Sequence, residues 1–133
     1  MRNNFLAVWS LMVIFMIGGC SAIPKAEEAV ADVEQGIAET QVFSITATQA
    51  ESIIKESFHE GWPDKELEPL GPNKLGYQIT LWFAIDREHI LAEAKKSSDG
   101  YSFKVTNRGT APVVGVPARK KLIELIQKNA VNL

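Results

Sequence analysis

The stretch YQITLWFAID, residues 77–86, decides the fold. Large apolar side chains occupy its odd positions, whereas its even positions are mixed. Successive side chains of a strand point to opposite faces of a sheet, so this alternation predicts a strand with one buried face. Trp82 falls on the other face. The stretch therefore predicts a sheet that is covered on one side and open on the other.

Two further strands are predicted after it. Asp99-Gly100 is typical of a tight hairpin, because both residues tolerate positive φ. Alternation of Tyr101, Phe103 and Val105 then predicts a strand over residues 101–106. Residues 89–96 favour a helix by propensity, but a meander with short turns is the simplest connection between the flanking strands. We predict a strand there, with a turn at 86–88, and helix is the alternative.

Two amphipathic helices flank these strands. Thr48 and Glu51 match a capping box, and Gly61 supplies a stop, which predicts a helix between them. Pro117 suits the first turn of a second helix that runs to about Val131. The apolar stripes are Ala50, Ile53, Ile54 and Phe58 in the first helix, and Leu122, Ile123, Leu125, Ile126 and Ala130 in the second.

The order of elements is α-β-β-β-α. Proline and glycine are dense in residues 62–76 and 107–116, which predicts loops. Both helices need a surface to cover, so we expect a two-layer α+β domain over residues 46–133, with the helices on one face of a three-stranded antiparallel meander. The chain has one cysteine, so no intrachain disulfide forms and the hydrophobic core must hold the fold.

Residues 1–20 have the character of an export signal. A polar start that carries Arg2 precedes an apolar run over residues 5–17, and Gly18 and Gly19 come before Cys20. A charged start, a short apolar stretch and a small-residue cleavage site are typical of a secretory signal peptide. The run is shorter than the roughly 20 residues that span a membrane. The alternative is an uncleaved anchor helix followed by a free thiol.

The segment Ile17-Gly18-Gly19-Cys20 resembles the lipobox of bacterial lipoproteins. The resemblance implies that residues 1–19 are removed and that Cys20 becomes the lipidated N-terminus, with a diacylglycerol on its sulfur and a fatty acid such as palmitate on its amino group. Ser21 after the cysteine, in place of Asp, implies the outer membrane, facing the periplasm. No other cofactor is expected.

Residues 20–45 are predicted to form an acidic tether. Its charged residues are Glu27, Glu28, Asp32, Glu34 and Glu39 against Lys25. One-sided charge and few large apolar residues favour a disordered or loosely helical spacer that lifts the domain off the membrane. A true helix over residues 25–37 is the alternative, because alanine and glutamate are good helix formers.

The sequence carries little that indicates catalysis. The formal net charge is −2, which implies no general attraction to nucleic acid. His59 and His89 are the only histidines, and neither belongs to a zinc-binding spacing. No phosphate-binding glycine loop and no serine nucleophile elbow is found. We therefore predict no metal site and no enzyme activity.

Two surfaces are candidate binding sites. Trp82 lies on the open sheet face, and an exposed tryptophan among polar residues is a plausible contact hot spot for a partner. The alternative is that the tether or the 62–76 loop covers it. Positive charge before and within the last helix predicts an anion site for lipid phosphate, peptidoglycan or an acidic partner, with a solvated basic turn as the alternative. The first surface comprises Gln78, Thr80, Trp82 and Lys104, and the second Arg108, Arg119, Lys120 and Lys121.

These observations favour a non-catalytic envelope lipoprotein, anchored to the membrane by lipid, that binds a protein partner or cell-wall material as an accessory or assembly factor. One alternative is a small-ligand binder with its site between the sheet and the loops at 62–76 and 107–116. A less favoured one is a small enzyme, which needs His59 or His89 within reach of a carboxylate or serine. The oligomeric state stays open.

Overall fold

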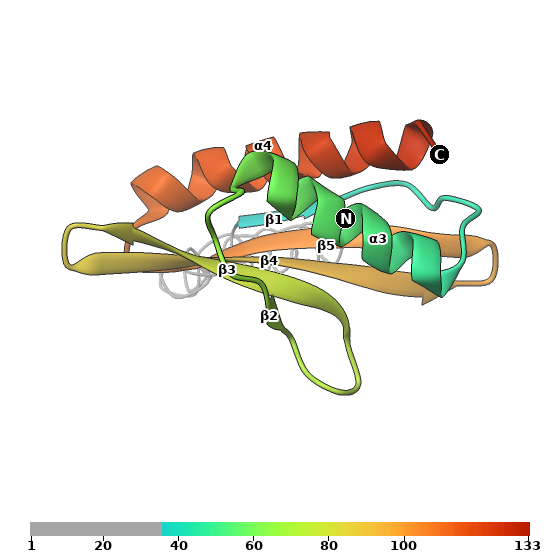
Figure 1. Ribbon diagram of the computed structural model, residues 1–133, viewed down its shortest axis with the longest axis horizontal. Coiled ribbons are helices and arrows are strands. Elements are labelled where there is room, and N and C mark those ends of the chain that lie inside the picture. The colour runs from blue at the N-terminus through green and yellow to red at the C-terminus, as the bar shows by residue number, and fades with distance from the viewer. Residues whose placement is uncertain (1–35) are drawn as a thin grey trace, which may run out of the picture. The chain divides into compact units, whose positions relative to one another are not determined.

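A computed structural model describes residues 36–133, so the predicted signal peptide, Cys20 and most of the predicted tether lie outside the described residues. The elements are β1 (Gly36–Glu39), α3 (Ala47–Gly61), β2 (Glu68–Pro69), β3 (Leu75–Phe83), β4 (Asp86–Ser97), β5 (Gly100–Gly109) and α4 (Pro112–Val131). The strands form one antiparallel sheet in the order β1-β5-β4-β3-β2, and both helices lie on one side of it (Figure 1). The predicted two-layer α+β class is confirmed.

The sheet is wider than predicted, because five strands form it and not three. The expected meander is its centre, β3–β4–β5, and strand rather than helix is confirmed for residues 89–96. β1 comes from the predicted tether and pairs with β5, with Gly36 opposite Asn107. β2 comes from a predicted loop and pairs with β3. Edge strands this short leave little sequence pattern, yet they satisfy backbone groups that the central strands would otherwise expose.

The first helix begins earlier than predicted. Thr46 is its N-cap, where the Thr46 hydroxyl accepts a hydrogen bond from the Gln49 amide at 3.2 Å and the Gln49 side chain accepts one from the Thr46 amide at 2.9 Å. The sequence offers this capping pattern twice, two residues apart. The predicted partner of Thr48, Glu51, instead accepts a hydrogen bond from the Tyr77 hydroxyl at 2.6 Å.

The second helix also begins earlier. Pro112 occupies its first turn, so that Pro117 lies inside the helix and not at its start. β5 continues to Gly109, and the predicted loop over 107–116 is reduced to a short connection. The β3–β4 turn consists of Ala84 and Ile85 rather than the predicted residues 86–88.

The core lies between the helices and the sheet. Alternation sends the odd positions of β3 toward the helices, as predicted, and small Ala92 and Ala94 at the centre of β4 let the helices approach closely. The largest buried side chains are Ile53, Ile54, Phe58, Ile79, Ile90, Phe103, Val105, Leu122 and Ile126. Both helices therefore pack their apolar stripes against one sheet face, although Ile123 and Leu125 of the predicted second stripe are only half-buried.

A buried polar network fixes α4 on the sheet. Glu88 is only 1% exposed, and its carboxylate accepts hydrogen bonds from the Asn107 side chain at 2.7 Å and the Ala111 amide at 3.3 Å. Arg119 of α4 donates to the Asn107 side-chain oxygen at 2.8 Å. Ala111 has no side chain that could cap the helix. The Glu88 carboxylate takes that role, where the helix dipole also favours negative charge.

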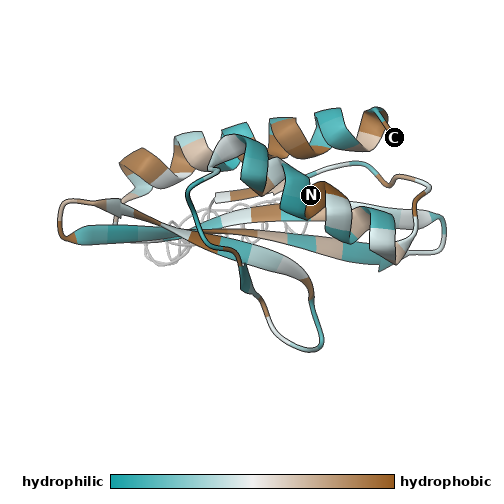
Figure 2. Ribbon diagram, in the orientation of Figure 1, coloured by the Kyte–Doolittle hydropathy of each residue, from teal (hydrophilic) through white to brown (hydrophobic). Residues whose placement is uncertain are grey.

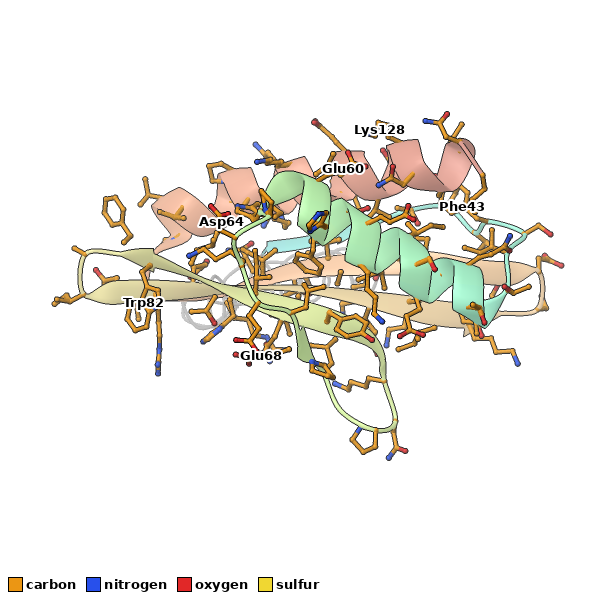
Figure 3. All side chains as sticks on the ribbon, viewed as in Figure 1. Phe43, Glu60, Asp64, Glu68, Trp82 and Lys128 are labelled. Carbon is orange, nitrogen blue, oxygen red and sulfur yellow. The ribbon has the colours of Figure 1, made fainter. Side chains whose placement is uncertain are left out.

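The two helices also meet at their solvent-facing sides. Lys128 of α4 pairs with Glu60 of α3 at 2.6 Å (Figure 3), and this hydrogen bond lowers the pKa of Glu60. Lys121 donates to the Gly61 carbonyl at 2.9 Å and lies 4.7 Å from the centre of the Trp62 ring. Exposed pairs of this kind add little stability, but together they set the lateral spacing of the helices.

The network at Glu88 gives a first prediction. Glu88→Ala leaves the Ala111 amide and the Asn107 side chain without their buried acceptor, so the free energy of unfolding should fall by about 2–3 kcal/mol. Urea unfolding measures this. Glu124→Ala removes an exposed carboxylate from α4, the helix that Glu88 caps, and should change the free energy of unfolding by less than about 0.5 kcal/mol. Equal effects of the two substitutions would show that the network does not stabilise the fold.

Candidate functional site

The sheet face opposite the helices carries most of the predicted binding residues. We call it the open face, and it comprises the even positions of β3 and their cross-strand partners. In β3–β4–β5 register, Gln78 lies opposite Leu91 and Thr106, and Thr80 lies opposite His89 and Arg108. Trp82 projects from this face, away from both helices (Figure 3). These side chains follow from the same alternation that buries the core.

A groove with a volume of about 320 Å³ lies on the open face. Strands β3, β4 and β5 form its floor. Its wall is the segment that connects β2 to β3, which bends toward the side of the sheet away from the helices (Figure 1) and supplies Leu70 and Lys74. The groove is therefore built between a sheet and a loop.

The wall depends on a glycine in β3. A Cβ atom at Gly76 would lie 2.6 Å from the Leu70 side chain and 2.3 Å from the Ala92 carbonyl oxygen. Only glycine therefore lets Leu70 pack over this strand. The Leu70 amide also donates to the Gly76 carbonyl at 3.1 Å, and Gln78 donates to Glu68 of β2 at 3.2 Å. These contacts hold the loop beside the sheet.

The groove lining is strongly cationic. Four of its side chains are positively charged, namely Lys74, Lys95, Lys104 and Arg108, and one, Glu93, is negative. Glu93 pairs with Lys95 at 3.3 Å and also lies opposite Lys104 in the sheet. One carboxylate offsets only part of this charge. A concave surface lined by one sign of charge attracts ligands of the opposite sign.

The structure places all four predicted partner-contact residues on the open face, two of them in the groove. Gln78 and Lys104 line it, whereas Thr80 and Trp82 lie outside its lining on the same face. The Thr80 hydroxyl lies 3.0 Å from a ring nitrogen of His89. Trp82 is 61% exposed, so the 62–76 segment does not cover it.

The four residues of the predicted anion site do not come together. Because β5 extends through Gly109, alternation puts Arg108 on the open face, in the groove. Arg119 instead bonds to Asn107 on the helix side. Lys121 contacts the end of α3, and Lys120 is exposed on α4. The positive charge of the groove therefore comes from Arg108 and three lysines, not from the predicted set.

Sequence reasoning did not assign Lys74, Lys95 and Glu93 to a site. Glu93 and Lys95 stand two residues apart in a segment that was correctly predicted as a strand, so their shared face was available from the pattern. Lys74 gave no such signal, because its position depends on the path of a loop. The groove as a cavity therefore required the structure.

We next consider groups in residues 36–133 that could bind a metal ion or take part in catalysis. In this range no three His, Cys, Asp or Glu side chains lie close enough together to hold a metal ion. His59 is exposed near the end of α3, and His89 faces Thr80. No helix in the same range combines the length and the apolar character that crossing a bilayer requires.

Comparison of the chain with models of known protein families gives no match, and comparison with curated proteins finds no relative. The site is therefore interpreted from its own residues.

The exposure of Trp82 gives a second prediction. Trp82→Ala should change the free energy of unfolding by less than about 1 kcal/mol, because an exposed side chain leaves no cavity. Phe103→Ala, on the buried side of the sheet, should cost about 3–5 kcal/mol. Chemical denaturation of both variants checks the contrast. A comparable loss at Trp82 would place it in the core.

Proposed function

We propose that this chain is a lipid-anchored protein of the bacterial cell envelope that binds an acidic partner through the open face and catalyses no reaction. The observation that carries the proposal is the groove, in which four cations and one carboxylate line a cavity of about 320 Å³. Cations that line one groove repel one another. A bound acidic segment relieves that repulsion.

The shape of the surface favours a macromolecular partner. The cations lie along a sheet face, and Trp82 extends that face beyond the groove. Charged contacts supply specificity and speed of association, whereas an exposed tryptophan is typical of the residues that supply affinity. An acidic protein segment could contact both the cations of the groove and the tryptophan. Cell-wall peptides carry carboxylates as well and share this chemistry.

The lipobox resemblance at residues 17–20 supports the anchor, and Ser21 favours the outer membrane. Lipid chains on Cys20 would hold the domain at a surface without spanning it. Confinement of this kind raises the effective concentration of partners on the same membrane, so a weak charged contact suffices. An accessory or assembly role follows from such weak and local binding.

The groove is tested by cross-linking in cells. A photoreactive amino acid at Gln78 should form adducts with a partner, and the same group at the exposed Lys120 on α4 should not. Lys104→Glu should then reduce the Gln78 adduct about tenfold or more, because one attractive contact becomes repulsive. Lys120→Glu makes the same change in net charge away from the groove and should leave the adduct unchanged.

The captured partner decides the outcome. An acidic segment at the cross-linked site, mapped by mass spectrometry, is the expected result. A basic or uncharged segment, or equal loss of adduct with Lys120→Glu, would contradict binding through the cationic groove.

The groove volume also favours a second candidate, a small anionic ligand, because ligand pockets begin at about 300 Å³. Trp82 separates the two candidates. A macromolecular partner that spans the open face loses affinity with Trp82→Ala, whereas a small ligand confined to the groove does not. Titration of the variant with the identified partner or ligand measures the difference.

The anchor gives a further prediction. Cys20→Ser should leave an unprocessed precursor and abolish labelling by a fatty-acid probe, because only the thiol accepts the diacylglycerol. Gel mobility and probe fluorescence in cells measure both effects. Ser21→Ala should be processed and labelled normally. Normal processing of Cys20→Ser would refute the lipoprotein assignment.

A further inference from the structure

The end of the β3–β4 hairpin is a second unusual surface. Trp82, Phe83 and Ile85 are 61%, 52% and 92% exposed. With Ala84 they form four consecutive nonpolar residues at the β3–β4 turn. The turn lies at one end of the sheet and is coloured largely toward the hydrophobic end of the scale in Figure 2. Alternation puts Trp82 on the open face and Phe83 on the helix face, so apolar side chains surround the hairpin end on both sides. Single exposed apolar residues are common on protein surfaces, but three large ones at one hairpin end are typical of an interaction site.

The turn is also poorly suited to its own geometry. Ala84 has a φ of 55°, and it is the only residue other than glycine with positive φ among those that the structure describes. Two-residue hairpins favour asparagine and glycine here, because these residues tolerate that conformation. Alanine is unfavourable at positive φ, and the isoleucine that follows it is unfavourable in water. Local rules broken together in this way are characteristic of functional positions.

The chain enters the sheet toward this same end. Gly36 of β1 pairs with Asn107, which pairs with Ile90, whereas Glu39 pairs with Lys104, which pairs with Glu93. Gly36 is therefore the end of β1 nearer to the hairpin turn. Residues 21–35 separate it from Cys20, and that length of chain reaches at most about 50 Å. A lipid on Cys20 thus keeps the hairpin within reach of the bilayer.

Cations stand directly behind the apolar end. Arg87 is exposed and lies opposite Trp82 in the β3–β4 register, and exposed Arg108 lies one strand further on, opposite His89. Asp86, the first residue after the turn, accepts a hydrogen bond from the Thr110 hydroxyl at 3.1 Å. Tryptophan with arginine is the pairing that prefers the membrane interface, where the ring meets acyl chains and the guanidinium meets lipid phosphate.

We propose that the hairpin end, Trp82 to Ile85, inserts into the headgroup region of the membrane that holds the lipid of Cys20. The inference rests on the proposed lipid anchor. It gives the domain a second, reversible contact with the same bilayer. The expected lipid surface is phospholipid with a fraction of anionic headgroups, because Arg87 and Arg108 face it.

The tryptophans of the chain provide the test. Trp62→Phe leaves Trp82 as the only tryptophan of the processed protein, because Trp9 lies in the signal. Trp82→Phe leaves Trp62, which packs between Phe58 and Lys121, as the matched control. Each lipidated protein is reconstituted into phosphatidylethanolamine and phosphatidylglycerol vesicles that contain brominated lipid. We expect quenching of Trp82 several-fold stronger than that of Trp62.

A substitution in the turn adds a second measurement. Ile85→Ser should lower the ratio of docked to undocked molecules about tenfold, as expected from the loss of one buried apolar side chain. Val131→Ser removes another exposed apolar side chain, 68% accessible against 92% for Ile85, at the far end of α4 and should not change the quenching of Trp82. Circular dichroism of both variants verifies that the fold is intact.

The outcomes separate this inference from the proposed function. Equal or absent quenching of the two tryptophans overturns membrane docking, as does a photoreactive group at position 85 that labels a protein and no lipid. Mass spectrometry of the N-terminal peptide reports lipidation of Cys20 on the same sample. Lys104→Glu should weaken partner binding about tenfold and leave the Trp82 quenching unchanged. Loss of quenching with this variant would also count against an independent membrane contact.

Discussion

The organisation of this protein depends on the fact that both of its helices cover the same face of one sheet. Alternation in β3, β4 and β5 sends one set of side chains into the core and the other to the open face. Glu88 reinforces the arrangement, because its buried carboxylate caps α4 and holds that helix over the sheet. The open face is consequently free of packing requirements, and its residues can serve binding.

Because the open face is not packed against a helix, it can carry a concentration of charge. Lys104 and Arg108 of β5 and Lys95 of β4 share one groove, and Glu93 offsets only part of their mutual repulsion. Stability alone would favour an even mixture of charges, because cations gathered on one face repel one another although none of them lies directly opposite another in the sheet. The groove wall adds Lys74, although Gly76 must remain glycine to let that wall approach. The charge repulsion and the required glycine both serve the same positive surface, which supports our proposal that this surface binds an acidic partner.

The sequence predicts the elements far better than their edges. Strong alternation identified β3, and the apolar stripes identified both helices, because core burial imposes these periods on every residue of an element. The N-cap was displaced because Thr46 and Thr48 begin equivalent capping patterns. β1 was missed because four residues carry too little pattern to show pairing with a distant strand. For the site, alternation placed Gln78, Trp82 and Lys104 on one face, whereas Lys74 depended on a loop whose path the sequence does not encode locally.

Partner binding through the lysines of the groove is compatible with insertion of the hairpin end, because the two lie at different parts of one face, whereas Trp82 can serve only one of the two contacts at a time. Trp82 and Ile85 lie at the turn, whereas Lys104 and Lys95 lie further along the strands toward the β4–β5 hairpin. With the turn in the headgroup region, the strands would point away from the bilayer and the groove would face the aqueous side. Rotational freedom of a tethered domain opposes binding, because orientation must be fixed before contacts form. A hairpin that fixes orientation at the membrane would lower that cost, so docking of the apolar end on the bilayer would favour binding of the acidic partner by the cationic groove.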